Sequence, residues 1–109
     1  MPEVSDKEIG RRLFHVHREK RVEIAIKKMK TGIGPEWKTY SADKIGVLNH
    51  ILQCTWNVID QKAWDTIPFE KVTKNDLDKI FRLGEGVSPG KNPSPENVEE
   101  IRRILLAVS

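Results

Sequence analysis

The sequence predicts an all-α protein, a small bundle of about four helices packed around a central helix. Apolar residues between positions 42 and 66 recur every three or four residues and cover roughly 200° of a helical circumference, about twice what a surface helix needs. Four segments start at residues that cap helix N-termini, and the first three of them stop at glycine or proline. A length of 109 residues with 38% hydrophobic content fits one core, so we expect a single helical domain over residues 1–109.

The first expected helix begins at Ser5 and ends near Gly32. Ser5 and Glu8 have the spacing of a capping box, in which each side chain bonds to the backbone N–H of the other residue. Lysines precede Gly32, where the helix dipole favours positive charge, and the glycine itself is a common C-terminal cap. Three apolar residues share one face of this helix: Ile9, Leu13 and Val16.

The same segment also carries a strand signal. Val22, Ile24 and Ile26 alternate with other residues, as they would in a strand with one buried face. A β-hairpin at about residues 13–28 would make the protein α+β, which is the alternative fold. We favour the helix because both of its ends are capped and no turn residue separates the two halves of the segment.

The second expected helix is the central one. Ser41 is a good N-cap, and the helix should run from Ala42 to about Thr66 until Pro68 stops it. Two adjoining apolar stripes predict that it packs against neighbours on two sides. The stripes consist of Ile45, Leu48, Leu52, Trp56, Ile59 and Ala63, and of Val47, Ile51, Cys54 and Val58.

Two shorter helices should complete the bundle. The third begins near Thr73, where Asp76 completes a second capping box, and ends at Gly84. The fourth begins with Ser94 as N-cap and Pro95 in the first turn. Their buried faces should be formed by Leu77, Ile80 and Phe81, and by Val98, Ile101, Ile104, Leu105 and Val108.

Composition and charge limit the class of function. The chain has 19 Lys and Arg against 16 Asp and Glu, a net charge of +3, and ten of those basic residues lie in residues 1–40 against six acidic ones. This excess of positive charge in the first third favours a polyanionic partner. No apolar run approaches the roughly 20 residues of a membrane span, and one cysteine forms no internal disulfide, so we expect a cytoplasmic protein without a membrane partner.

No catalytic or cofactor motif is recognisable, so we expect a protein that is not an enzyme and has no cofactor or metal. The isolated glycine pairs lack the frame of a phosphate-binding loop. His50 and Cys54 are four residues apart, which allows an activated thiol, but a cysteine among apolar neighbours is usually inert. With His15 and His17 they make four zinc-ligand types, and only a strand would place His15 and His17 on the same side.

Basic residues at the N-terminal end are the first candidates for contact with nucleic-acid phosphates. An alternative interpretation is a solvated helix face, since Glu19 and Glu23 lie among them. The candidates on the first helix are Arg11, Arg12, Arg18, Lys20 and Arg21, and the same dense cluster continues through Lys27, Lys28 and Lys30.

The C-terminal third suggests a second nucleic-acid contact. Its segment 90–109, with Gly-Lys-Asn-Pro-Ser-Pro-Glu at the start, resembles the closing segment of Cro-type helix-turn-helix domains. The resemblance implies that the helix after Thr73 is a recognition helix and that the protein takes part in transcription regulation. The chain departs from that family in its long preceding helix, its Ile67-Pro68-Phe69 turn and its longer loop, and Ser-Pro-Glu is also common at helix starts. The residues implied to face nucleic acid are Lys74, Asn75, Lys79 and Arg82, with Lys91 in the loop.

The most favoured function is therefore that of a small, non-enzymatic, basic helical protein that binds nucleic acid or regulates through phosphate contacts. The alternative is a protein–protein interaction module, such as an adaptor, inhibitor or assembly subunit, or a homodimer, without a nucleic-acid role. Candidate partner-binding residues are Trp37, in a loop, and Leu106, which lies off the apolar stripe of the last helix. Trp37 could equally close over the core.

Overall fold

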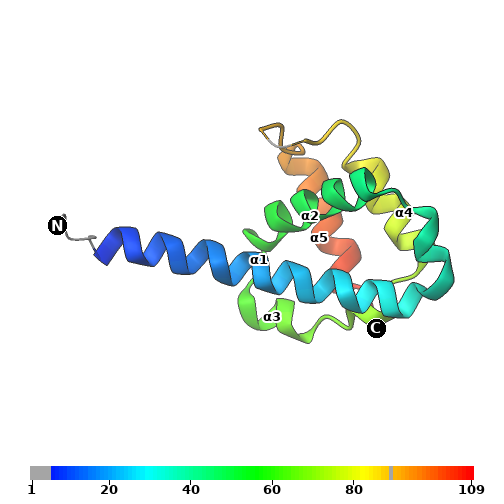
Figure 1. Cartoon of the computed structure of the whole chain (residues 1–109), viewed down its shortest axis with the longest axis horizontal. Helices are drawn as coiled ribbons and strands as arrows, with labels where there is room; N and C mark the ends of the chain where they lie inside the picture. Colours follow the sequence, from blue (N-terminus) through cyan, green and yellow to red (C-terminus); the bar gives the residue numbers. More distant parts are fainter. Residues whose placement is uncertain (1–5, 89) are drawn as a thin grey trace.

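The computed structural model of the chain is all-α, as the sequence predicts, and no strand occurs in the ranges that it describes (Figure 1). It describes the backbone of residues 6–88 and 90–109 and the side chains of residues 16–88 and 90–109. Five α-helices and two short 3-10 helices, η1 and η2, follow one another in those ranges. In chain order they are α1 (Asp6–Ile33), η1 (Gly34–Thr39), α2 (Ala42–Trp56), α3 (Gln61–Thr66), η2 (Phe69–Lys71), α4 (Lys74–Leu83) and α5 (Pro95–Leu106).

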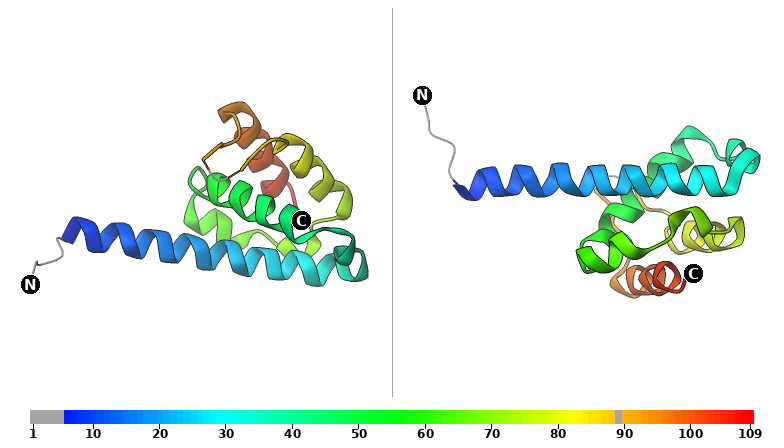
Figure 2. Two further views of the ribbon diagram at one scale, coloured as in Figure 1. Left: turned by 45° about the horizontal axis from the view of Figure 1, so that its top comes forward. Right: turned by 90° about the horizontal axis from the view of Figure 1, so that it is seen from below.

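Helix α1 is much longer than the others, and its N-terminal half projects beyond the compact part of the molecule (Figures 1 and 2). The alternative β-hairpin at 13–28 is wrong, because α1 spans this whole segment. Val22, Ala25 and Met29 are at most 1% exposed and follow the three- and four-residue spacing of one helix face. Ile24 is 39% exposed, so the alternation that suggested a strand does not correspond to alternating burial.

Helix α1 ends near Gly32, as predicted, but Gly32 is not its cap: the helix continues to Ile33, and Gly34 adopts the positive φ of 73° at the turn into η1. Gly32 instead lies against the backbone of η2. A Cβ atom built at Gly32 would collide with the carbonyl group of Glu70. The missing side chain therefore lets α1 approach η2 closely.

The predicted helix from Ala42 to about Thr66 is two helices, α2 and α3, because the chain turns at residues 57–60. Asp60 is the N-cap of α3, and its carboxylate accepts a hydrogen bond from the backbone N–H of Lys62 at 2.8 Å. Asn57 and Asp60 favour such caps, and the β-branched residues beside them have low helix propensity. Ile59 and Trp64, on either side of Asp60, both face the core, so the apolar periodicity of the sequence continues across the break.

Helix α2 is central, as predicted. It packs against α1 on one side and α5 on the other, and Leu48, Ile51 and Leu52 are fully buried. The predicted N-caps of α2, α4 and α5 are confirmed, since Ser41, Thr73 and Ser94 each accept a backbone hydrogen bond from the residue three positions on. None of the helices in the described ranges is both long and apolar enough to span a membrane.

We predict that Gly32→Ala lowers the free energy of unfolding by about 1–3 kcal/mol, because α1 must move away from η2. Gly46→Ala is the matched control, since Gly46 also lies within a helix and a Cβ there meets nothing within 4 Å. The control should raise the free energy of unfolding by about 0.4–1 kcal/mol. Urea unfolding followed by circular dichroism measures both. Equal stabilisation by the two substitutions would contradict the close contact.

Candidate nucleic-acid interface

An open groove lies where α1 ends and η1 begins. It has a volume of about 620 Å³, and its lining includes three lysines, Lys27, Lys30 and Lys38. Gly34 and Pro35 form the turn that brings Lys38 back beside the end of α1. We call this feature the lysine groove, defined by Lys27, Lys30, Thr31, Gly34, Pro35, Trp37 and Lys38.

The lysine groove has a positive electrostatic character. None of the described side chains that line it is acidic, and Lys30 and Lys38 are exposed. Lys27 forms an ion pair with Glu23 at 3.1 Å, but both side chains are largely exposed, where such a pair contributes little. The groove therefore presents three ammonium groups to solvent and to any anion that enters it.

Trp37 forms part of the wall of the groove and belongs mainly to the core. It is 9% exposed, and its ring meets Tyr40 edge to face with ring centroids 5.8 Å apart. This placement agrees with the expectation that Trp37 closes over the core. A partner would reach only the small part of the indole that borders the groove.

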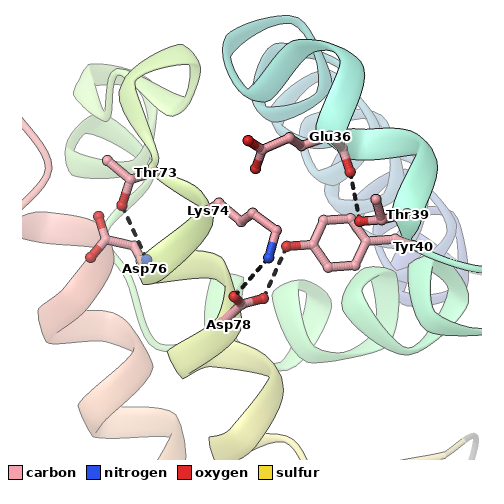
Figure 3. Close-up of polar contacts among 7 residues, drawn as sticks. All are labelled: Glu36, Thr39, Tyr40, Thr73, Lys74, Asp76 and Asp78. Atoms are coloured by element: carbon pink, nitrogen blue, oxygen red, sulfur yellow. Dashed lines mark hydrogen bonds and ion pairs between the residues drawn. The ribbon is translucent and has the colours of Figure 1, made fainter.

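Tyr40 fastens η1 to α4 (Figure 3). Its hydroxyl donates a hydrogen bond to Asp78 Oδ1 at 3.0 Å, and Lys74 Nζ donates to Asp78 Oδ2 at 3.2 Å. The ammonium of Lys44 lies 4.7 Å from the ring centroid of Phe81 and 5.3 Å from that of Tyr40, within the range of cation–π attraction. These contacts hold the end of η1, and with it Lys38, against the bundle.

The pKa values of Tyr40 and Asp78 shift in opposite directions. Burial, together with the hydrogen bond and the negative charge of Asp78, raises the pKa of Tyr40 to about 12. Partial burial alone would raise the pKa of Asp78. Hydrogen bonds from Tyr40 and Lys74 and the charges of Lys74 and Lys44 outweigh this effect, so the pKa of Asp78 lies below its usual value.

The structure distributes the predicted basic residues of α1 over different environments. Arg18 is half-buried and donates a hydrogen bond to Asn57 Oδ1 at 3.3 Å, and Arg21 forms an ion pair with Asp65 at 3.0 Å. Lys20 is exposed. The side chains of Arg11 and Arg12 lie outside the described residues.

The predicted recognition helix, α4, presents a polar face opposite buried Leu77 and Ile80. It is preceded by the six-residue α3 and by η2. Lys91 lies in the loop, where it exchanges two backbone hydrogen bonds with Ser88, and Leu106 is 41% exposed on α5. The exposed polar residues predicted on α4 are Lys74, Asn75, Lys79 and Arg82.

His50 and Cys54 meet Asn92, and the arrangement does not activate the thiol. His50 Nε2 lies 2.9 Å from Asn92 Oδ1, which only accepts, so this nitrogen carries the hydrogen. The same nitrogen is the one 3.9 Å from Cys54 Sγ, and it therefore has no lone pair to take the thiol proton. Burial raises the pKa of Cys54 despite the nearby positive charge of Arg18. Among the described side chains, no three potential metal ligands of the His, Cys, Asp or Glu types come together.

Comparisons of the chain with protein-family models, curated proteins and solved structures found no match.

Lys38 is the residue of the groove that the sequence analysis missed. The basic cluster on the first helix included Lys27 and Lys30, but Lys38 follows them across a glycine and a proline. The signal was the Gly34-Pro35 pair itself, because a tight turn at the end of a basic helix folds the next few residues back on it.

We predict that Tyr40, the only tyrosine of the chain, titrates near pH 12 in the folded protein and near pH 10 in urea. Absorbance at about 295 nm measures both midpoints, because it rises when the phenol ionises, whereas the absorbance of the three tryptophans does not change with ionisation. The folded pKa exceeds the unfolded one, so this stabilisation is complete below pH 10 and is lost as the pH rises towards 12.

Asp78→Asn should lower the midpoint of the folded protein, because it removes the negative charge beside the phenol. Asp43→Asn, at an exposed aspartate on α2, is the control and should leave it unchanged. Coincident midpoints in the folded and the unfolded wild type would contradict the Tyr40–Asp78 contact.

Proposed function

We propose that this protein binds nucleic acid through phosphate contacts made by the lysine groove and the outer face of α1. One observation carries the proposal. Lys27, Lys30 and Lys38 come from two elements and line one open groove, and no acidic residue lines it within the part of the chain whose side chains are described. Ammonium groups that converge on a solvent-filled groove attract a chain of phosphates, and they release its counterions when they bind it.

The outer face of α1 extends this surface along the helix axis. Lys20 and Lys28 are exposed on α1 in addition to the groove lysines. The ten residue steps of helix from Lys20 to Lys30 span about 15 Å, which matches about four phosphates of one strand along the duplex axis, at a rise of about 3.4 Å each. Such contacts provide affinity without sequence preference.

A regulatory role in the cytoplasm, including transcription regulation, belongs to the same proposal. Sequence preference would come from the exposed face of α4, where Asn75, Lys79 and Arg82 carry the donors and acceptors that read base edges. The alternative of a protein–protein interaction module is supported by Leu106, whose side chain is 41% exposed on α5.

The test is fluorescence anisotropy of labelled duplex and single-stranded DNA, titrated with protein at several salt concentrations. We predict binding that weakens steeply with salt. In the Lys30→Gln/Lys38→Gln double variant, the slope of log K against log salt should become shallower by about 2, because two phosphate contacts are lost.

Lys62→Gln/Lys71→Gln is the matched control, because both lysines are exposed on α3 and η2 and the change in net charge is the same. It should leave the slope nearly unchanged. Absence of binding at low salt, or an equal loss in both double variants, would refute the proposed interface.

A further inference from the structure

A second hollow lies between α1 and the segment formed by α3 and η2. Its volume is about 250 Å³, and it shares no lining residue with the lysine groove. Arg21, Ile24 and Lys28 contribute to it from α1, and Trp64, Asp65 and Phe69 contribute from the other side. At 100° per residue, the three α1 positions fall within one narrow sector of the helix, so they face the hollow together.

The inner part of this hollow is apolar and aromatic. Trp64 and Phe69 are each 3% exposed, and their ring centroids are 5.0 Å apart. Ile24 is 39% exposed, although it lies beside these rings. Because both rings are already almost fully buried, Ile24 provides most of the apolar surface here, and an apolar ligand that covered Ile24 would remove that surface from water, which is favourable.

The rim of the hollow carries two cations and one anion. The Arg21 guanidinium contacts Asp65 Oδ1 at 3.0 Å, and both side chains are partly exposed. Lys28 has no carboxylate within 4 Å among the described side chains. The rim therefore has an excess of one positive charge, and Asp65 already occupies the position that a second anion would take beside Arg21.

We propose that this hollow binds a small organic anion, a carboxylate attached to a flat apolar group. The apolar group would lie against Ile24 and the edges of Trp64 and Phe69, and the carboxylate would pair with Lys28 and compete with Asp65 for Arg21. The volume is slightly below the range of drug-sized pockets, which suits a ligand with a single ring. This inference does not depend on nucleic-acid binding, because the hollow shares no lining residue with the lysine groove, although Lys28 also belongs to the outer face of α1.

The experiment titrates the whole protein with benzoate and follows the indole N–H signals in a two-dimensional NMR spectrum. The chain has three tryptophans, and Trp64→Phe identifies the signal of Trp64. We expect a saturable shift of the Trp64 signal, with the Trp37 signal beside the lysine groove unchanged. Acetate should bind at least tenfold more weakly than benzoate, because it lacks the apolar ring.

Two substitutions should change the affinity for benzoate in opposite directions. Lys28→Gln should weaken binding about tenfold, because it removes a charged hydrogen-bond donor, and Asp65→Asn should strengthen it severalfold, because it frees Arg21. Lys30→Gln and Glu85→Gln are the controls with the same changes in charge at exposed residues outside the hollow, and they should have little effect.

Three outcomes would overturn the proposal. The first is a Trp64 signal that does not shift at benzoate concentrations of about 10 mM, where even a millimolar site would be largely filled. The second is equal binding of acetate and benzoate, which would indicate charge alone. The third is an equal response of each variant and its control, which would indicate a general effect of net charge.

Discussion

Close contact between Gly32 of α1 and the backbone of η2 at Glu70 determines where the longest helix of this protein lies. Because no Cβ intervenes, Val22, Ala25 and Met29 reach the core and are almost fully buried. The opposite side of α1, which carries Lys20 and Lys27, is thereby directed to solvent. Both the lysine groove and the hollow that Arg21 and Lys28 border follow from this one placement of α1.

A second constraint acts at the end of α1. Gly34 takes a positive φ, so the chain reverses into η1, and the Tyr40–Asp78 hydrogen bond then fastens η1 to α4 (Figure 3). Trp37 anchors the same segment in the core. Trp37 and Tyr40 flank Lys38 in the sequence, and their contacts therefore hold Lys38 beside Lys30. A groove built in this way is largely formed before a ligand arrives, which lowers the entropic cost of binding.

Local signals in the sequence predicted most of the architecture. Ser41, Thr73 and Ser94 cap helices as expected, because a side-chain oxygen that satisfies a backbone N–H needs only its nearest neighbours. The break at residues 57–60, where Asp60 caps α3, was missed because the apolar period continues through it and predicts one long helix. Gly32 was predicted to cap the end of the helix. Its actual role, a close approach to η2, is a tertiary contact that the local sequence does not show.

The candidate site was only partly predictable for the same reason. Basic density along α1 is visible in the sequence, but the neutralisation of Arg21 by Asp65 depends on residues 44 positions apart. Likewise, Lys38 joins the groove only through the turn at Gly34. Composition therefore indicated a positively charged region, and packing decided which of its cations remain available to an anion.

We propose that the lysine groove, rather than the polar face of α4, is the primary contact with nucleic acid. Mapping of backbone amide shifts by NMR during titration with a short unlabelled duplex tests it most directly. The account predicts that the largest shifts fall in residues 27–38, with smaller ones along the outer face of α1. Shifts confined to residues 74–83, or the absence of shifts at low salt, would contradict it.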